Sequence, residues 1–281
     1  MAGDKLTDRA TVEGFGREWT TFDQSGRDHR ELRASFDRYF AIFPWDTIPE
    51  RGIGIDIGCG TGRWARFVAP RVGRLLCVDP SEPAASVARR ALSEVPNADV
   101  QVAAAGGLPV ANASLDFGYA IGVLHHMPDP AVGLRDCARV LKPGAPFLVY
   151  LYYALDNRPV WFRALWQATD AARRSISRLP FRVRYWLTQA IAVLVYWPLA
   201  RAARLAETLG IDRRRVDLVP LSFYRHKPFY IMRNDALDRF GTRVEHRYTR
   251  QELRELMEGN GFCDVIISPE APYWCAVART A

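Results

Sequence analysis

Apolar and polar positions follow two alternating periods along residues 52–153. Short apolar runs of the kind found in buried strands lie at 53–57, 74–79, 99–104, 114–121 and 146–153. The stretches between them carry helical spacing, as in 81–95 and 130–141, and they end at Pro or Gly. Strands that alternate with helices at this spacing predict right-handed crossovers and a parallel sheet. An amphipathic helix at 249–262 and two strands at 263–268 and 273–278 complete a predicted seven-stranded α/β fold.

This order is interrupted by a long segment without a convincing strand. Residues 155–220 are helical by composition and rich in Arg, Trp and Ala. We therefore expect three parts: an N-terminal helical segment at 1–50, a core formed by 51–154 and 231–281, and a helical insertion at 155–230.

The net charge of +7 is concentrated in that insertion. Residues 158–215 hold twelve arginines and three acids, so this segment carries +9 and the remaining chain carries −2. Five scattered cysteines form no C-x-x-C pair and no cluster with histidine, which argues against a zinc site or a disulfide framework. No apolar signal segment stands at the N-terminus. These features predict a cytoplasmic protein without a metal centre.

The stretch GIGIDIGCGTGR at 52–63 carries the first chemical signal. An apolar strand ends near Asp56 and turns through Gly58, Gly60 and Gly62 into a helix. Only glycine lets the backbone come close to a bound ligand at such a turn, which is typical of nucleotide-binding folds. The second strand ends in Asp79, an acid placed to accept hydrogen bonds from a ribose diol.

With these pieces the chain resembles the class I S-adenosylmethionine-dependent methyltransferases. The matching motifs are DIGCGTG at 56–62, VDPS at 78–81, LPVANASLDF at 108–117, GVLHHMPDP at 122–130 and LKPG at 141–144. They occur in the family's order and spacing. The resemblance implies a Rossmann-like, doubly wound sheet of seven strands whose last strand runs antiparallel, with a helical insertion. It also implies S-adenosylmethionine as the cofactor.

The resemblance assigns residues to the cofactor site. The set is Asp56, Gly58, Cys59, Gly60, Gly62, Asp79, Pro80, Leu108 and Leu124. One position departs from the family pattern, because Ala104 stands where many relatives carry an acid that binds adenine. That departure keeps open an alternative of another class, a non-catalytic protein that binds S-adenosylmethionine.

Three residues are candidates for catalysis. His125 and His126 follow the fourth strand at the carboxyl edge of the sheet, and a histidine suits the role of general base. Tyr152 follows the fifth strand. Tyr153, His226 and His246 are further candidates for the acceptor pocket, and each of the three histidine or tyrosine positions also has an ordinary packing explanation.

The insertion should determine the acceptor. Its apolar run YWLTQAIAVLVYWPLA at 185–200 is shorter than the ~20 apolar residues of a bilayer span. Three interpretations stay open: a lid over the acceptor pocket, an interfacial helix with flanking arginines, and, least favoured, a nucleic-acid surface.

Together these features predict methyl transfer from S-adenosylmethionine to a small-molecule or glycan-type acceptor, with oxygen as the expected site. The alternative is action at the membrane on a lipid or a lipid-linked saccharide, with peripheral membrane association. Nothing in the pattern bears on the oligomeric state.

Overall fold

The computed structural model describes residues 6–22, 28–156, 158–272 and 274–281. The chain divides into two compact units at residues 156/157 and 243/244, and the C-terminal segment returns to the first unit. Residue 273, predicted to begin the last strand, and residues 1–5 and 23–27 of the predicted N-terminal segment lie outside the described residues.

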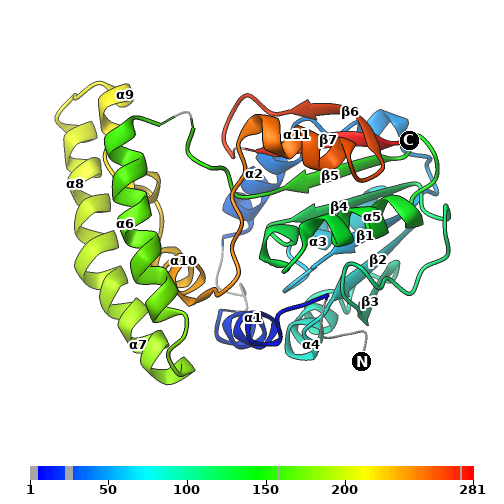
Figure 1. Ribbon diagram of the computed structural model, residues 1–281, viewed down its shortest axis with the longest axis horizontal. Helices are drawn as coiled ribbons and strands as arrows, with labels where there is room; N and C mark the ends of the chain where they lie inside the picture. The colour runs from blue at the N-terminus through cyan, green and yellow to red at the C-terminus, as the bar shows by residue number, and fades with distance from the viewer. Residues whose placement is uncertain (1–5, 23–27, 157, 273) are drawn as a thin grey trace. The chain divides into compact units, whose positions relative to one another are not determined.

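The first unit is built on a seven-stranded sheet in the order β3-β2-β1-β4-β5-β7-β6 (Figure 1). The strands are β1 Ile53–Ile57, β2 Arg74–Asp79, β3 Ala98–Val102, β4 Phe117–Ile121, β5 Pro146–Tyr150, β6 Phe262–Ile267 and β7 Cys275–Thr280. The first five pair in parallel, whereas β7 is antiparallel to β5 and to β6. The predicted seven-stranded Rossmann-like sheet with an antiparallel last strand is therefore confirmed.

Helices cover both faces of this sheet (Figure 1). They are α1 Arg9–Thr21, α2 His29–Tyr39, α3 Ala65–Val68, α4 Glu82–Ala91, α5 Pro130–Val140 and α11 Arg250–Glu258. One apolar cluster packs Ile55 and Val149 with Leu134 of α5 and Leu253 of α11. A second cluster packs other strand residues with side chains of α2 and α3. Successive residues of β1, β4 and β5 point to opposite faces of the sheet and are buried on both, so these strands contribute to both cores.

The predicted strands at 114–121 and 146–153 are each three residues shorter in the structure, and backbone pairing explains why. The segment 114–116 forms an isolated bridge from Leu115 to Leu141, and Asp116 accepts a hydrogen bond from the Ile53 amide through its side chain. After β5, Tyr153 pairs with Tyr248 instead of with a sheet strand. Both segments thus pair with parts of the chain that local patterning does not reveal.

The order of the strands fixes where a ligand can bind. The connection after β1 leads to β2 on one side, whereas β4 pairs on the other side of β1. Ligands of open α/β sheets bind at such a reversal, outside the carboxyl ends of the strands. The glycine turn after β1 and the 3₁₀ turn Leu124–His126 after β4 both lie at this edge.

The second unit is helical. It contains α6 Val160–Ile176, α7 Phe181–Ile191, a π-helical turn at Ala192–Tyr196, α8 Trp197–Thr208, α9 Arg213–Val216 and α10 Phe229–Gly241. Its own small core packs Ala192, Tyr196 and Ala200 against Met232 and Phe240. The predicted boundary at 230/231 falls inside α10, because this helix packs on α7 and α6 of the same unit. Among the described residues no helix has the length and apolarity needed to cross a membrane.

Candidate active site

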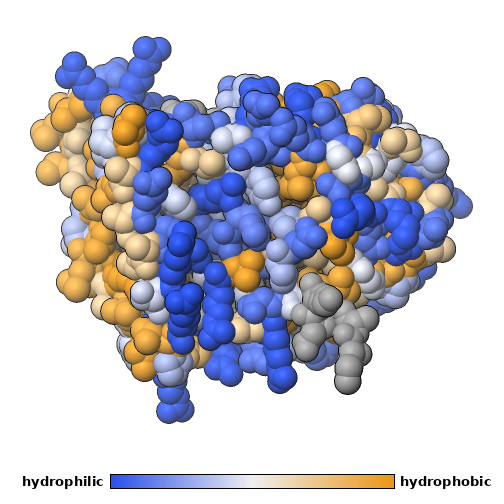
Figure 2. Space-filling view, viewed as in Figure 1, coloured by the Kyte–Doolittle hydropathy of each residue, from blue (hydrophilic) through white to orange (hydrophobic). Residues whose placement is uncertain are grey.

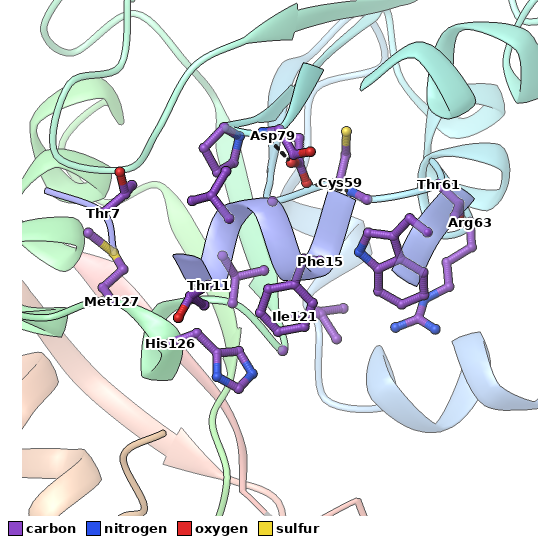
Figure 3. Close-up of a pocket in the computed structure, with 18 of the residues that line it drawn as sticks. Thr7, Thr11, Phe15, Cys59, Thr61, Arg63, Asp79, Ile121, His126 and Met127 are labelled. Atoms are coloured by element: carbon purple, nitrogen blue, oxygen red, sulfur yellow. Dashed lines mark hydrogen bonds between the residues drawn. The ribbon is translucent and has the colours of Figure 1, made fainter. Parts of the chain in front are cut away.

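A pocket that is partly open to solvent lies in the first unit, at the carboxyl edge of the strands (Figure 3). It is lined by Thr7, Asp8, Thr11, Val12, Phe15, Trp19, Gly58, Cys59, Gly60, Thr61, Arg63, Trp64, Asp79, Pro80, Ser81, Ile121, Gly122, Val123, His126 and Met127. The residues come from α1, the glycine turn, the end of β2 and the segment after β4.

The glycine turn forms the floor of the pocket. Gly58 and Gly60 have φ of +70° and +55°, a conformation that L-residues with side chains adopt at a cost. A Cβ on Gly58 would overlap the Val123 side chain. The amides of Gly58 and Cys59 donate to the Val78 carbonyl at 2.7 and 2.9 Å, which ties the turn to β2. The third glycine, Gly62, does not line the pocket.

Asp79 stands beside this turn and is almost fully buried. Its Oδ2 accepts from the Gly60 amide and its Oδ1 from the Ser81 amide, each at 2.9 Å. Burial raises the pKa of the Asp79 carboxyl to about 6, although both hydrogen bonds act to lower it. Each carboxylate oxygen can accept a second hydrogen bond. The carboxylate can therefore accept hydrogen bonds from the hydroxyls of a ribose, while its hydrogen bonds from the Gly60 and Ser81 amides hold it in place.

These features fit the adenosyl cofactor that the motifs imply. Glycine has no Cβ, so a ligand can come close to the backbone of this turn. A Cβ on Gly60 would stand 3.2 Å from Nε1 of Trp19 on the covering helix. Asp79 adds acceptors at the pocket wall. Gly58, Gly60 and Asp79 would hold the cofactor.

Asp56 lies beneath the turn and does not line the pocket. Burial raises the pKa of its carboxyl to about 7, with a smaller lowering effect from the neighbouring Tyr119 hydroxyl. The contact with Tyr119 lacks the geometry of a full hydrogen bond, since Asp56 Oδ2 and Tyr119 Oη have no such partner among the described residues. Asp56 is thus a buried acid behind the turn.

Helix α1 covers the pocket, and the sequence patterning assigned it no such role. Thr11, Phe15 and Trp19 lie on the helical face that points toward the glycine turn. Figure 3 shows Thr11 and Phe15 between Asp79 and His126. The Arg63 guanidinium lies 5.2 Å from the centroid of the Trp19 ring. Gly16 permits close packing, because a Cβ there would overlap Ser81 Oγ at the start of α4. The i, i+4, i+8 spacing of Thr11, Phe15 and Trp19 is the signal that could have indicated this face.

His126 reaches the pocket, and its ring is oriented from behind. Its Nδ1 lies 2.8 Å from the Val244 carbonyl oxygen. A carbonyl oxygen only accepts, so Nδ1 carries a proton and donates it to this hydrogen bond. The ring also contacts Phe15 of α1, with centroids 4.9 Å apart.

His125 has a different environment although it is the next residue. It is fully buried, and neither ring nitrogen has a hydrogen-bond partner in the described part of the chain. Burial holds the pKa of His125 well below its usual value, and the charges of His126, Arg247 and His246 lower it further. Its ring packs on Tyr152 with centroids 4.0 Å apart. The His125 ring is therefore a neutral packing group behind His126.

The structure brings half of the predicted site residues to the pocket. Those that line it are Gly58, Cys59, Gly60, Asp79, Pro80 and His126, whereas Asp56, Gly62, Leu108, Leu124, His125 and Tyr152 do not. Leu108 and Leu124 are buried in the apolar cluster beside α5. No position from 102 to 108, including Ala104, is among the lining residues.

The remaining candidates lie elsewhere. His226 belongs to the second unit and pairs with Glu207. His246 places Nε2 3.1 Å from the Met127 carbonyl oxygen, and its amide donates to the His125 carbonyl. In the described ranges, no group of three or more His, Cys, Asp or Glu side chains could hold a metal ion.

Known proteins are similar to part of this chain. Residues 55–149 match the methyltransferase domain family. An O-methyltransferase of Pyrenophora dematioidea is 40% identical over 95 residues, which are 32% of this chain and 36% of that protein. A ubiquinone biosynthesis O-methyltransferase of Hahella chejuensis is 35% identical over 106 residues, 37% of this chain and 43% of that protein. The chain thus spans less than half the length of these curated relatives.

Solved structures share the fold over almost the whole chain. A possible histamine N-methyltransferase from Thermotoga maritima aligns with a TM-score of 0.53 and 16% identity, and covers 96% of this chain and 99% of its own. A methyltransferase from Bacillus halodurans aligns with a TM-score of 0.52 and 14% identity over 83% of this chain and 70% of its own. At this identity the likeness shows the fold alone. The motifs, the sheet and the domain match together establish that the chain contains a class I S-adenosylmethionine-dependent methyltransferase domain, with S-adenosylmethionine as its cofactor.

Proposed function

We propose that the protein methylates a hydroxyl group of a small-molecule or glycan-type acceptor. The observation that carries this proposal is His126, which lines the cofactor pocket while its Nδ1–H is held by the Val244 carbonyl. A hydroxyl has to lose its proton as it is methylated, and an imidazole oriented through Nδ1 is suited to receive that proton at Nε2.

When bound, S-adenosylmethionine supplies an electrophilic methyl group on a positively charged sulfur, which becomes a neutral thioether after transfer. The protein then has to orient the acceptor, exclude water and receive one proton. Phe15 and Trp19 of α1 cover the pocket and limit the access of water. His126 receives the proton at Nε2, and the Val244 carbonyl stabilises the resulting imidazolium through Nδ1–H.

His125 and Tyr152 act in this scheme as positioning residues. The His125 ring lies 4.0 Å from the centroids of both the His126 and Tyr152 rings. Since burial keeps His125 neutral, it places no second positive charge beside the His126 imidazolium. Support for oxygen as the methylated atom also comes from the names of several relatives, which are O-methyltransferases.

The substitution His126→Asn tests the proposal. An asparagine side-chain amide can still donate to the Val244 carbonyl, but it cannot accept the proton. With a panel of phenols, sugars and lipid-linked saccharides, we expect kcat to fall about 10²- to 10⁴-fold, the usual contribution of a general base. Cofactor affinity should stay within about twofold, because Asp79 and the glycine turn are unchanged.

The matched control is His226→Asn, which removes a histidine of the second unit and should leave kcat unchanged. The proposal is wrong if His126→Asn turns over at the wild-type rate. If the wild-type protein binds S-adenosylmethionine and forms no S-adenosylhomocysteine with any acceptor, the non-catalytic alternative replaces it.

A lipid-linked acceptor is a second candidate, favoured by one observation. Large apolar side chains of the second unit are exposed along α7, the π-helical turn and α8, including Trp186 and Leu194. A membrane-bound acceptor would be recognised where such a surface meets the bilayer.

A further inference from the structure

Helix α7 of the second unit has an inverted distribution of polar and apolar side chains, and the exposed apolar side chains continue beyond it. Along α7, the π-helical turn and α8, every exposed residue from Val183 to Leu205 is apolar except Arg204. The inward side of α7 buries Arg184, Thr188 and Gln189, whereas the π-helical turn and α8 bury alanines and Tyr196. A surface helix of a globular protein normally does the opposite, with its apolar stripe against the core.

The exposed residues form one continuous stripe. Val183, Trp186, Leu187 and Leu194 recur at spacings of three, four and seven, which places them on one helical face. The stripe continues through Trp197 to Leu205 and is about 34 Å long at the helical rise per residue. Figure 2 shows hydrophobic residues gathered along the edge of this unit where α7 and α8 run. We name this surface, from Val183 to Leu205, the apolar stripe.

The π-helical turn at Ala192–Tyr196 increases the exposure of the stripe at its middle. Pro198 has no amide hydrogen and its ring disturbs the preceding turn, which accounts for the widened helix there. Three consecutive apolar residues, Val193, Leu194 and Val195, are exposed as a result, and Leu194 is 73% exposed.

The buried side of the segment explains why the stripe cannot turn inward. Arg184 Nη1 donates to the carbonyls of Ser177 and Gly241, and Gln189 Oε1 accepts from Arg233. Rotating the helix to bury the stripe would turn Arg184 toward solvent and would leave the carbonyls of Ser177 and Gly241 without this donor. The exposure of the stripe is therefore built into the packing of the second unit.

The positive charge of this segment, together with its apolar stripe, indicates the kind of partner that binds it. Residues 158–215 carry +9, and the exposed Arg182 and Arg204 lie at the two ends of the apolar stripe. A second copy of this unit would bring a surface of the same charge, so self-association is disfavoured. A nucleic acid would use the arginines but would leave the stripe in water. A bilayer with anionic headgroups satisfies both, since it takes apolar side chains and tryptophans at the interface and attracts arginine.

We propose that the apolar stripe binds the surface of an anionic membrane, lying in the plane of the headgroups without crossing the bilayer. Leu194 and its neighbours in the widened turn enter the acyl boundary, and Trp186 and Trp197 lie at headgroup level. Arg182 and Arg204 contact lipid phosphates at either end. This proposal deepens the function proposed above by naming the partner of the second unit, yet it does not require methyl transfer.

Co-sedimentation of the full-length protein with vesicles tests it. Vesicles of phosphatidylcholine alone and vesicles with added phosphatidylglycerol are compared at about 50 mM and about 500 mM salt. We expect binding to the anionic vesicles that weakens at high salt without disappearing, because the apolar contribution is not screened. Leu194→Glu should lower the partition coefficient at least about tenfold, a change of ~1.4 kcal/mol.

The matched control is Ile266→Glu, which places the same charge on an exposed apolar residue of β6 in the first unit. It should bind vesicles like the wild type. Arg182→Glu combined with Arg204→Glu should reduce binding at low salt more than at high salt. Because Leu194 is exposed, its substitution should leave the melting temperature and cofactor affinity unchanged, and both are measured on every variant.

Three results would overturn the proposal. One is the absence of binding to either vesicle. Another is binding that disappears completely at high salt and is unaffected by Leu194→Glu, which would show attraction by arginine alone. The third is a dimer that Leu194→Glu dissociates, which would show that a second copy covers the stripe. None of these outcomes depends on catalysis, so failure here and failure of the methyl-transfer proposal are distinguishable.

Discussion

The two units of this protein differ in how they distribute apolar side chains. Of the nineteen large hydrophobic residues exposed in the described part of the chain, sixteen lie in the second unit and only Ile53, Val102 and Ile266 in the first. The first unit closes its core on both faces of a sheet. The second has a small core of alanines and a few aromatics, with its larger apolar residues outside. The first is therefore organised around an internal ligand pocket, and the second exposes the surface that we propose binds a membrane.

Core and stripe leucines should respond very differently to truncation, and this is the largest effect expected. Leu148 of β5 is fully buried, so Leu148→Ala should lower the free energy of unfolding by about 2–5 kcal/mol. Leu194→Ala should change it by less than about 0.5 kcal/mol. Urea unfolding measures both. A cost above about 2 kcal/mol for Leu194→Ala would mean that the stripe is covered in the folded protein.

Removing the ribose acceptor should be the next largest effect. We expect Asp79→Ala to weaken S-adenosylmethionine binding by at least about 30-fold, since charge-assisted hydrogen bonds are lost. Calorimetry measures the affinity, with Asp99→Ala on the neighbouring edge strand as the control. Unchanged affinity would remove Asp79 from the ribose role.

The buried acid behind the glycine turn should make stability depend on pH. The pKa of Asp56 is about 7 in the folded protein and 3.8 in an ordinary setting, so between these values the folded state holds a proton that the unfolded state releases. The free energy of unfolding then falls as pH rises through this window, and Asp79, with a pKa of about 6, acts in the same direction. Asp56→Asn should be more stable relative to wild type at pH 8 than at pH 4 by roughly 2–4 kcal/mol.

Urea unfolding of wild type and Asp56→Asn at both pH values checks this expectation. An equal difference between the two proteins at both pH values would show that Asp56 is ionised in the folded state.

The cover over the pocket should give the smallest effect. Trp19→Ala removes the indole beside Gly60 and its contact with Arg63. We expect cofactor affinity to fall about 5- to 10-fold, or ~1 kcal/mol, because one wall of the pocket opens to water. Trp45→Ala is the control, since Trp45 does not line the pocket. If it lowers cofactor affinity as much as Trp19→Ala does, the loss comes from general destabilisation of the fold.

Local patterning could predict the sheet, the glycine turn and Asp79, because strand, turn and helix signals there lie within a few residues of each other. It could not separate His125 from His126. The distinction depends on the Val244 carbonyl, which is 118 residues away in sequence and orients only one of the two rings. It also missed the role of α1, whose face is defined by contact with the distant residues Gly60 and Ser81.

The second unit shows a different difficulty. Its apolar run was visible in the sequence, but a hydrophobic run alone does not tell which face is buried. The inward arginine Arg184 decides this through carbonyls of Ser177 and Gly241, on other elements of the unit. The end of the unit was also missed, since α10 packs with the inserted helices.

Methyl transfer from carbon-13 methyl-labelled S-adenosylmethionine, followed by NMR on polar and lipid acceptor fractions, tests the central claim most directly. The proposed function predicts a new methoxyl carbon signal that wild-type protein produces and His126→Asn does not. An N-methyl signal, or no transfer by a protein that binds the cofactor, would contradict it.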